Sequence, residues 1–104
     1  MIITNTDFVP GHEVKEIVGI AIGNTVRAKH IGKDITAGLK SMIGGEIKQY
    51  TEMLTEARRE SINRMINNAT EMNADAIINV RFMTAATMSG AAELLAYGTA
   101  VRLG

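Results

Sequence analysis

Two long segments of the chain alternate bulky and small apolar residues. Residues 14–28 carry mostly branched side chains at even positions, and residues 91–103 carry bulky side chains at odd positions. Because side chains alternate between the two faces of a strand, each segment predicts a strand with one bulky face and one small face. The small residues, which indicate a close approach by another backbone, include Gly19, Ala21, Gly23 and Gly98.

The same pattern bears on how these strands are covered. A strand with one face exposed to water normally carries polar side chains on that face. Neither of these two segments has a polar face. Both faces should therefore be covered, but a chain of 104 residues forms one domain, 1–104, with few layers of its own. We expect the missing cover to come from further copies of the chain, which predicts a homo-oligomer.

A long amphipathic helix is predicted over residues 46–72, where apolar residues recur at spacings of three and four. In its second half the apolar stripe widens to include Ile62 and Ile66, which indicates a neighbour beyond the sheet. Asn73 is expected to end the helix in a left-handed conformation. The stripe consists of Ile47, Tyr50, Leu54, Ala57, Ser61, Met65, Ala69 and Met72.

Two shorter elements precede this helix. Residues 1–4 predict a first strand, and Asp34 is a typical N-cap for a short helix over 35–42. A glycine inside that helix, Gly38, favours close packing. The pair Gly44 and Gly45 is interpreted as a tight joint between the two helices rather than as a phosphate-binding loop, because no phosphate-loop motif is present.

The last two strands are predicted to form an antiparallel hairpin. Residues 75–83 form the first of them, with Ile78 and Val80 on one side and Ile77 and Arg81 on the other, and residues 84–90 form the turn. The whole pattern predicts an α+β fold of order β-β-α-α-β-β. In this fold, a small antiparallel or mixed sheet packs against one long amphipathic helix.

Composition excludes several functional classes. The chain has 11 basic and 11 acidic residues, so no basic excess favours nucleic acid. It contains no cysteine, which removes disulfides, thiolate nucleophiles and cysteine-based zinc sites. No secretory signal and no membrane-spanning run is found in the sequence. We expect a cytoplasmic protein without a nucleic-acid or membrane partner.

The stretch KDITAGLKSMIGGEI at residues 33–47 resembles the central signature of the YbjQ-like proteins, whose description names heavy-metal binding. The pieces YTEML at 50–54, NADAI at 73–77 and YGTAV at 97–101 agree, so the resemblance covers nearly the whole chain. It implies a curved sheet packed on one long helix, assembled as a ring-like homopentamer. Where the signature suits a helix-ending glycine, this chain has Asn73.

Metal binding is the chemistry that the resemblance implies. The candidate ligands for a divalent metal ion are His30, Asp34 and Glu46, but the sequence has no closely spaced set of three or four ligands. His12 and His30 flank a whole strand and should lie near its opposite ends. A ring of identical copies could still build a site from one ligand per copy. The alternative is that both histidines are loop residues without a metal.

The remaining candidates concern packing and catalysis. None of the three serines lies in a nucleophile-elbow motif, and no catalytic set is found, which predicts a protein that is not an enzyme. Arg58 lies close to the apolar stripe, where its charge needs a partner, either a carboxylate across a subunit interface or a bound anion. The residues predicted to serve packing or oligomer contacts are Gly19, Ala21, Gly23, Gly38, Gly44, Gly45, Arg58, Ile62, Ile66 and Gly98.

Three functions follow from these observations. The first is a non-enzymatic oligomer that binds a metal ion or small ligand at its subunit joints or in its interior. The second is a structural or protein-interaction module without ligand chemistry. The third is an enzyme whose active site is shared between subunits, for which the sequence offers no cluster of polar residues.

Overall fold

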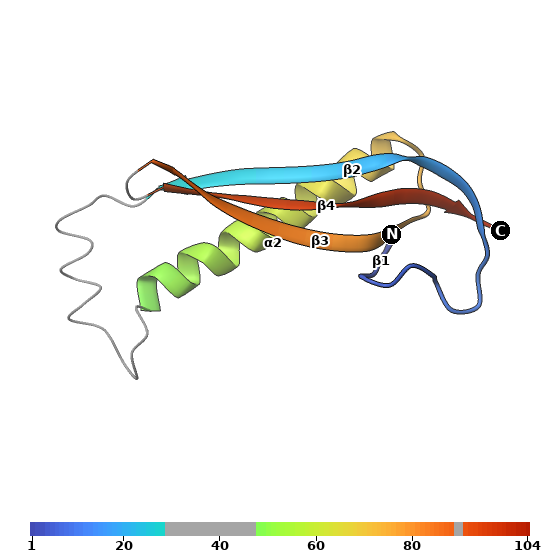
Figure 1. Cartoon of the computed structure of the whole chain (residues 1–104), viewed down its shortest axis with the longest axis horizontal. Helices are drawn as coiled ribbons and strands as arrows, with labels where there is room; N and C mark the ends of the chain where they lie inside the picture. The colour runs from blue at the N-terminus through green and yellow to red at the C-terminus, as the bar shows by residue number, and fades with distance from the viewer. Residues whose placement is uncertain (29–47, 89–90) are drawn as a thin grey trace.

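The computed structural model describes residues 1–28, 48–88 and 91–104. In these residues the chain forms one mixed sheet and one long helix (Figure 1). The elements are β1 (Ile2–Ile3), β2 (Val14–Ala28), α2 (Lys48–Glu71), β3 (Ala76–Met88) and β4 (Ala91–Leu103). The predicted α+β class is confirmed. The predicted short helix over 35–42 lies outside the described residues, so the full predicted order is not tested there.

The sheet has the strand order β1-β3-β4-β2. β1 runs parallel to β3, and β4 pairs antiparallel with β3 on one side and with β2 on the other. Helix α2 packs along one face, mainly against β2 and β4, so the described part of the chain has two layers (Figure 1). We call the face turned away from α2 the outer face of the sheet.

The helix-covered face is built from small residues on the strands and a few larger ones between them. Ala57, Ser61, Met65 and Ala69 are the buried residues of α2, all four from the predicted stripe. Buried side chains from the helix and from the sheet meet in this layer, so it forms the main core of the described residues. Its cluster consists of Ala21, Met65, Ala69, Ile77, Val80, Ala96 and Ala100.

The closest approach between the two layers is at Gly23. A Cβ atom added there would overlap the carbonyl oxygen of Ser61 and the amide nitrogen of Met65. The small face of β2 therefore lies against the backbone of α2 of the same chain. At Gly19 the layers are further apart, because an added Cβ would meet only the thioether of Met72, 3.2 Å away.

Polar side chains of α2 also bind the free edge of β2. Asn68 accepts a hydrogen bond from the Ile22 amide at 2.9 Å, and Arg64 donates one to the Asn24 carbonyl at 2.7 Å. Arg64 is held in turn by an ion pair with Glu60 at 3.1 Å, as the spacing of four predicts. These contacts satisfy edge groups that would otherwise be open to another strand.

A second, smaller cluster lies at one end of the outer face. It consists of Val9, Ala76, Ile78 and Val101, with Leu103 packed against it. Val9 belongs to the segment between β1 and β2, so the N-terminal segment covers this end of the sheet. Neighbouring residues on β4, Ala100 and Val101, belong to different clusters because they point to opposite faces.

Most predicted boundaries agree with the structure, and two predictions about β3 are wrong. β2 and β4 have their predicted bounds, and Asn73 is left-handed with φ 61°. β3 continues to Met88, so the turn predicted over 84–90 is wrong for residues 84–88. Thr84 and Ala85 pair with β4 instead, and this pairing satisfies their backbone groups although they lack bulky side chains.

The second wrong prediction concerns the faces of β3. Ile77 and Val80 were expected on opposite sides, but both belong to the helix-side core. A bulge between Ile78 and Arg81 explains this, because residues 79 and 80 stand opposite Gly98 alone. Asn79 at this bulge has φ 53°.

We predict that Gly23→Ala lowers the free energy of unfolding by about 3 kcal/mol, because the added methyl group overlaps helix backbone that cannot rotate away. Gly19→Ala is the matched control and should change it by less than about 1 kcal/mol, since the flexible end of Met72 can move. Urea unfolding followed by circular dichroism measures both. Equal midpoints for the two variants would contradict the close approach.

Candidate functional site

The outer face of the sheet exposes large apolar side chains beyond the part that the N-terminal segment covers. Ile20, Ile22 and Val26 of β2 are 65%, 49% and 53% exposed, and Met83 of β3 is 57% exposed. These are the bulky positions that the sequence predicts to be covered. Among the described residues, α2 covers the small residues on the opposite face of β2 and leaves these bulky side chains exposed.

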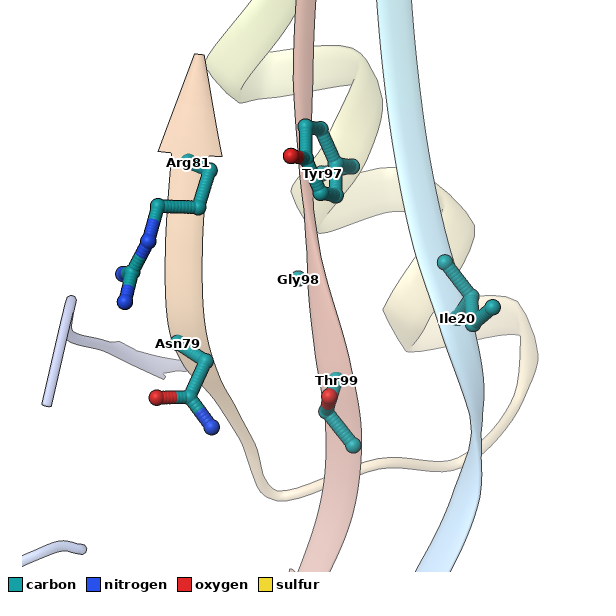
Figure 2. Close-up of a pocket in the computed structure, with 6 residues that line it drawn as sticks. All are labelled: Ile20, Asn79, Arg81, Tyr97, Gly98 and Thr99. Carbon is teal, nitrogen blue, oxygen red and sulfur yellow. The ribbon is translucent and has the colours of Figure 1, made fainter. Parts of the chain in front are cut away.

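A pocket of about 320 Å³ opens on this face (Figure 2). It spans three strands, because β2, β4 and β3 each contribute side chains. We call it the outer-face pocket. It is lined by Ile20, Asn79, Arg81, Tyr97, Gly98 and Thr99.

The bulge in β3 creates this pocket. Without an extra residue, strict alternation would turn Ile77, Asn79 and Arg81 to one face. The bulge lets Ile77 stay in the helix-side core while Asn79 and Arg81 both line the outer-face pocket. Bulges re-aim side chains in this way, and they are over-represented beside functional sites.

Gly98 stands opposite the bulge. It has no side chain and lies between Tyr97 and Thr99 in the pocket lining (Figure 2). A Cβ there would lie 2.6 Å from the Ile77 Cγ2 atom and 2.9 Å from the Ile78 carbonyl oxygen. The position therefore excludes any larger residue unless the bulge moves. Gly98, assigned to packing from the sequence, packs within the chain against β3.

The N-terminal segment fixes the bulge from its other side. The amides of Asn79 and Val80 donate hydrogen bonds to the carbonyls of Thr6 and Thr4, at 2.9 and 3.0 Å. The Arg81 guanidinium donates from Nη1 to the carbonyls of Asn5 and Val80, both at 3.0 Å. The position of the guanidinium is thus set by backbone atoms.

The polar groups of the pocket are donors and neutral acceptors. Figure 2 shows the guanidinium of Arg81 on the same side of β3 as the amide of Asn79, with the Tyr97 hydroxyl turned toward β3. Thr99 adds a second hydroxyl on β4, and Ile20 forms an apolar wall on β2. No aspartate or glutamate lines this pocket. The arrangement can hold a small molecule but provides no nucleophile paired with a base.

Two other hollows lie away from this pocket. One, of about 320 Å³, lies between α2, β3 and the segment at β1, and its lining includes Ile62 and Phe82. Ile66, the other residue of the widened stripe, packs against the helix-side core. The second hollow is polar and is lined by Arg27, Glu56, Arg59, Glu60 and Asn63.

The residues proposed from the sequence are not brought together as one site. Gly19, Ala21 and Gly23 lie on the helix-covered face of β2, whereas Arg58 is exposed on α2 and has no ion pair with the described residues. The metal candidates His30, Asp34 and Glu46 lie outside the described residues. So do the packing candidates Gly38, Gly44 and Gly45.

Metal ligands are not clustered in residues 1–28, 48–88 and 91–104, where no group of three or more His, Asp or Glu could hold an ion. His12 in that part of the chain is exposed. The helix in the same residues lacks the length and apolarity needed to cross a membrane.

Sequence reasoning missed the polar residues of the outer-face pocket. Asn79 and Arg81 were read as ordinary alternating residues of a strand, and Tyr97 and Thr99 as part of an apolar one. The available signal was that Arg81 is the one charged residue of β3 and Tyr97 the one aromatic residue of β4. Their pairing across β3 and β4 depends on the bulge, which no local pattern in the sequence marks.

In the residues that the structure describes, these observations define a two-layer α+β fold with a mixed sheet and exposed apolar side chains on its outer face. A solved structure with the same fold is that of a protein of unknown function from Pediococcus pentosaceus, of the DUF74 family. The likeness has a TM-score of 0.65 and covers 100% of this chain and 98% of that one, at 15% identity.

The family model described as "Putative heavy-metal-binding" matches residues 1–104. A UPF0145 protein from Archaeoglobus fulgidus is 66% identical over 99% of this chain and 95% of its own length. Another from Methanoculleus marisnigri is 61% identical over 99% and 96%. The chain therefore belongs to the YbjQ family. That family is of unknown function, and its description names no enzymatic reaction.

We predict that Asn79→Val destabilises the fold by about 2 kcal/mol, because a β-branched residue is disfavoured at φ 53°. Asn79→Gly should stay within about 0.5 kcal/mol of the parent, since glycine adopts this conformation freely. Thermal and urea unfolding of both variants measure the difference. If valine is tolerated as well as glycine, the bulge is not fixed as described.

Proposed function

We propose that this protein is a non-enzymatic homo-oligomer that binds a small ligand at the joints between its copies, with the outer-face pocket as the ligand site. The single observation that carries the proposal is the exposed apolar face of β2. A strand face that stays in water is normally polar. Here it consists of branched residues, while the opposite face of the same strand is already covered by α2.

The dimensions of the two layers support a cover from outside the chain. A strand of 15 residues is about 50 Å long, and a helix of 24 residues is about 36 Å long. The helix therefore cannot cover even one face completely. Because the formal net charge is zero, copies of the chain can approach one another without strong mutual repulsion.

A second copy is the simplest source of the missing layer, because its own outer face exposes the same apolar side chains to water. The family resemblance gives a ring of five as the expected assembly. The pocket lies on this face, so it would lie at or beside a joint between copies. The formal net charge of zero gives no basis for a nucleic-acid partner.

The alternative is a structural or protein-interaction module in which the same face binds another protein and the pocket holds nothing. A purified chain that stays monomeric and binds no small molecule would favour this alternative. An oligomer formed by the purified chain alone favours self-association.

We predict that Ile20→Lys dissociates the oligomer, because it places a charge in the centre of the proposed joint. Ile20 is 65% exposed in the single chain, so folding of the subunit should persist. The matched control is Asn67→Lys, which adds the same charge to an exposed position on α2. Light scattering at micromolar concentration measures the mass, and circular dichroism checks the fold.

The expected result is a multiple of the subunit mass for the parent and for Asn67→Lys, and a smaller species for Ile20→Lys. A folded monomer for the parent chain in dilute buffer would overturn the proposal. So would an Ile20→Lys variant with unchanged mass.

Metal binding is the second candidate, favoured by the description of the family. Because the residues that the structure describes hold no ligand cluster, a site would need His30, Asp34 or Glu46, with one ligand contributed by each of several copies. A single imidazole or carboxylate per copy is enough when several copies meet around one ion.

We predict that, if the dialysed protein without a His-tag binds zinc, His30→Ala weakens the binding at least tenfold. His12→Ala, in an exposed residue of the described part, is the control and should leave it unchanged. Calorimetric titration and metal analysis provide the measurement. Absence of heat and of bound zinc at micromolar concentration would exclude this candidate.

A further inference from the structure

We infer that the outer-face pocket binds a small organic carboxylate, with Arg81 as its anchor. This inference names the ligand class for the proposed oligomer and therefore rests on the proposed function. Three features carry it: the free edge of the Arg81 guanidinium, the absence of an internal counter-charge, and the apolar wall beside the polar groups.

The guanidinium is held so that one of its edges stays free. Both hydrogen bonds that Arg81 donates to the described residues leave from Nη1, to the carbonyls of Asn5 and Val80. Nε and Nη2 donate none to the described part of the chain. Two parallel N–H donors of this kind match the two oxygens of a carboxylate.

The charge of Arg81 has no partner among the described residues. Their ion pairs are Lys15 with Glu13 and Arg64 with Glu60, and no acidic residue lines the pocket. In one chain the guanidinium is exposed to water. Once a second copy covers this face, an unpaired cation would be costly to bury, so an anion is needed there.

The neighbouring groups fit a carboxylate with a hydrocarbon body. The hydroxyls of Tyr97 and Thr99 and the amide of Asn79 are further hydrogen-bond donors on the pocket wall. Ile20 lies on β2, the strand next to β4 on the side away from β3, and provides an apolar surface (Figure 2). At about 320 Å³ the pocket is at the small end of ligand sites.

A phosphate is the less suitable anion. The pocket has one cationic side chain and no lysine, whereas a doubly charged phosphate is normally held by several cations or by a helix N-terminus. The residues that line the pocket come only from strands, so no helix terminus contributes. A planar, singly charged carboxylate needs only the one arginine.

The test uses the full-length protein and 4-fluorobenzoate as the probe, observed by ¹⁹F NMR. We expect the parent protein to broaden the probe signal with a dissociation constant in the millimolar range or below. 4-Fluorobenzamide, which has the same shape without the charge, should bind at least tenfold more weakly. Inorganic phosphate should fail to displace the probe at equal concentration.

The variants locate the binding. Arg81→Gln should weaken probe binding at least tenfold, whereas Arg59→Gln removes the same charge from an exposed residue of α2 and should leave it unchanged. Arg81→Lys keeps the charge without the paired donors, and we expect an intermediate loss. It also serves as the second variant if Arg81→Gln fails to fold, which circular dichroism would show.

The two proposals fail in distinguishable ways. An oligomer, measured by light scattering, that does not bind 4-fluorobenzoate overturns the carboxylate inference and leaves the assembly standing. A monomer overturns the proposed function, whatever it binds. Probe binding that Arg81→Gln and Arg81→Lys do not change, or that phosphate displaces as well as benzoate does, also overturns the inference.

Discussion

The fold depends on the contact between the backbones of α2 and β2 at Gly23. No side chain separates the two layers there, so the helix lies directly on the strand. Ser61, beside this contact, donates its hydroxyl hydrogen to the carbonyls of Ala57 and Leu94, which links the helix to β4 as well. Because the helix lies so close, Arg64 and Asn68 reach the free edge of β2 and satisfy its backbone groups. The helix thus covers part of one face and part of one edge of the sheet, and the outer face receives no helix from the described residues.

The bulge in β3 brings two of the pocket's polar side chains, Asn79 and Arg81, to the outer face. The extra residue at the bulge in β3 turns Asn79 and Arg81 to the face opposite Ile77, and Gly98 leaves room for it. The N-terminal segment holds the bulge through the carbonyls of Thr4 and Thr6 and holds Arg81 through that of Asn5. A polar pocket with a fixed guanidinium therefore lies within an apolar surface. In the proposed oligomer, assembly and ligand binding would be coupled, because covering this surface would remove water from a guanidinium that has no ion pair with the described residues.

Much of the fold could be predicted from local patterns, but the candidate site could not. The spacing of apolar residues gave α2 within the described residues, and alternation gave β2 and β4 with their bounds. Alternation failed in β3, because it assumes that no residue is inserted, and the bulge at Asn79 violates that assumption. The outer-face pocket joins residues from three strands, so its composition depends on register. The proposed metal ligands His30, Asp34 and Glu46 lie outside the described residues, whereas the residues that line this pocket lie within them.

The sequence by itself determined the class of fold, the family and the amphipathic character of the helix, because each follows from residue identity and spacing within a continuous segment. It also predicted one small and one bulky face for β2 and β4, but in β2 the alternation is broken by a register shift between Ile17 and Gly19, where Val18 packs against the helix-side core and Ile17 is exposed. The tertiary structure decided which cover each face receives: the small face of β2 lies against α2 of the same chain, and the bulky face remains exposed in it. It alone placed Arg81 beside Tyr97 and Thr99. The physical reason is that pairing register and a left-handed bulge residue are set by contacts between segments far apart in the sequence, which no local periodicity records.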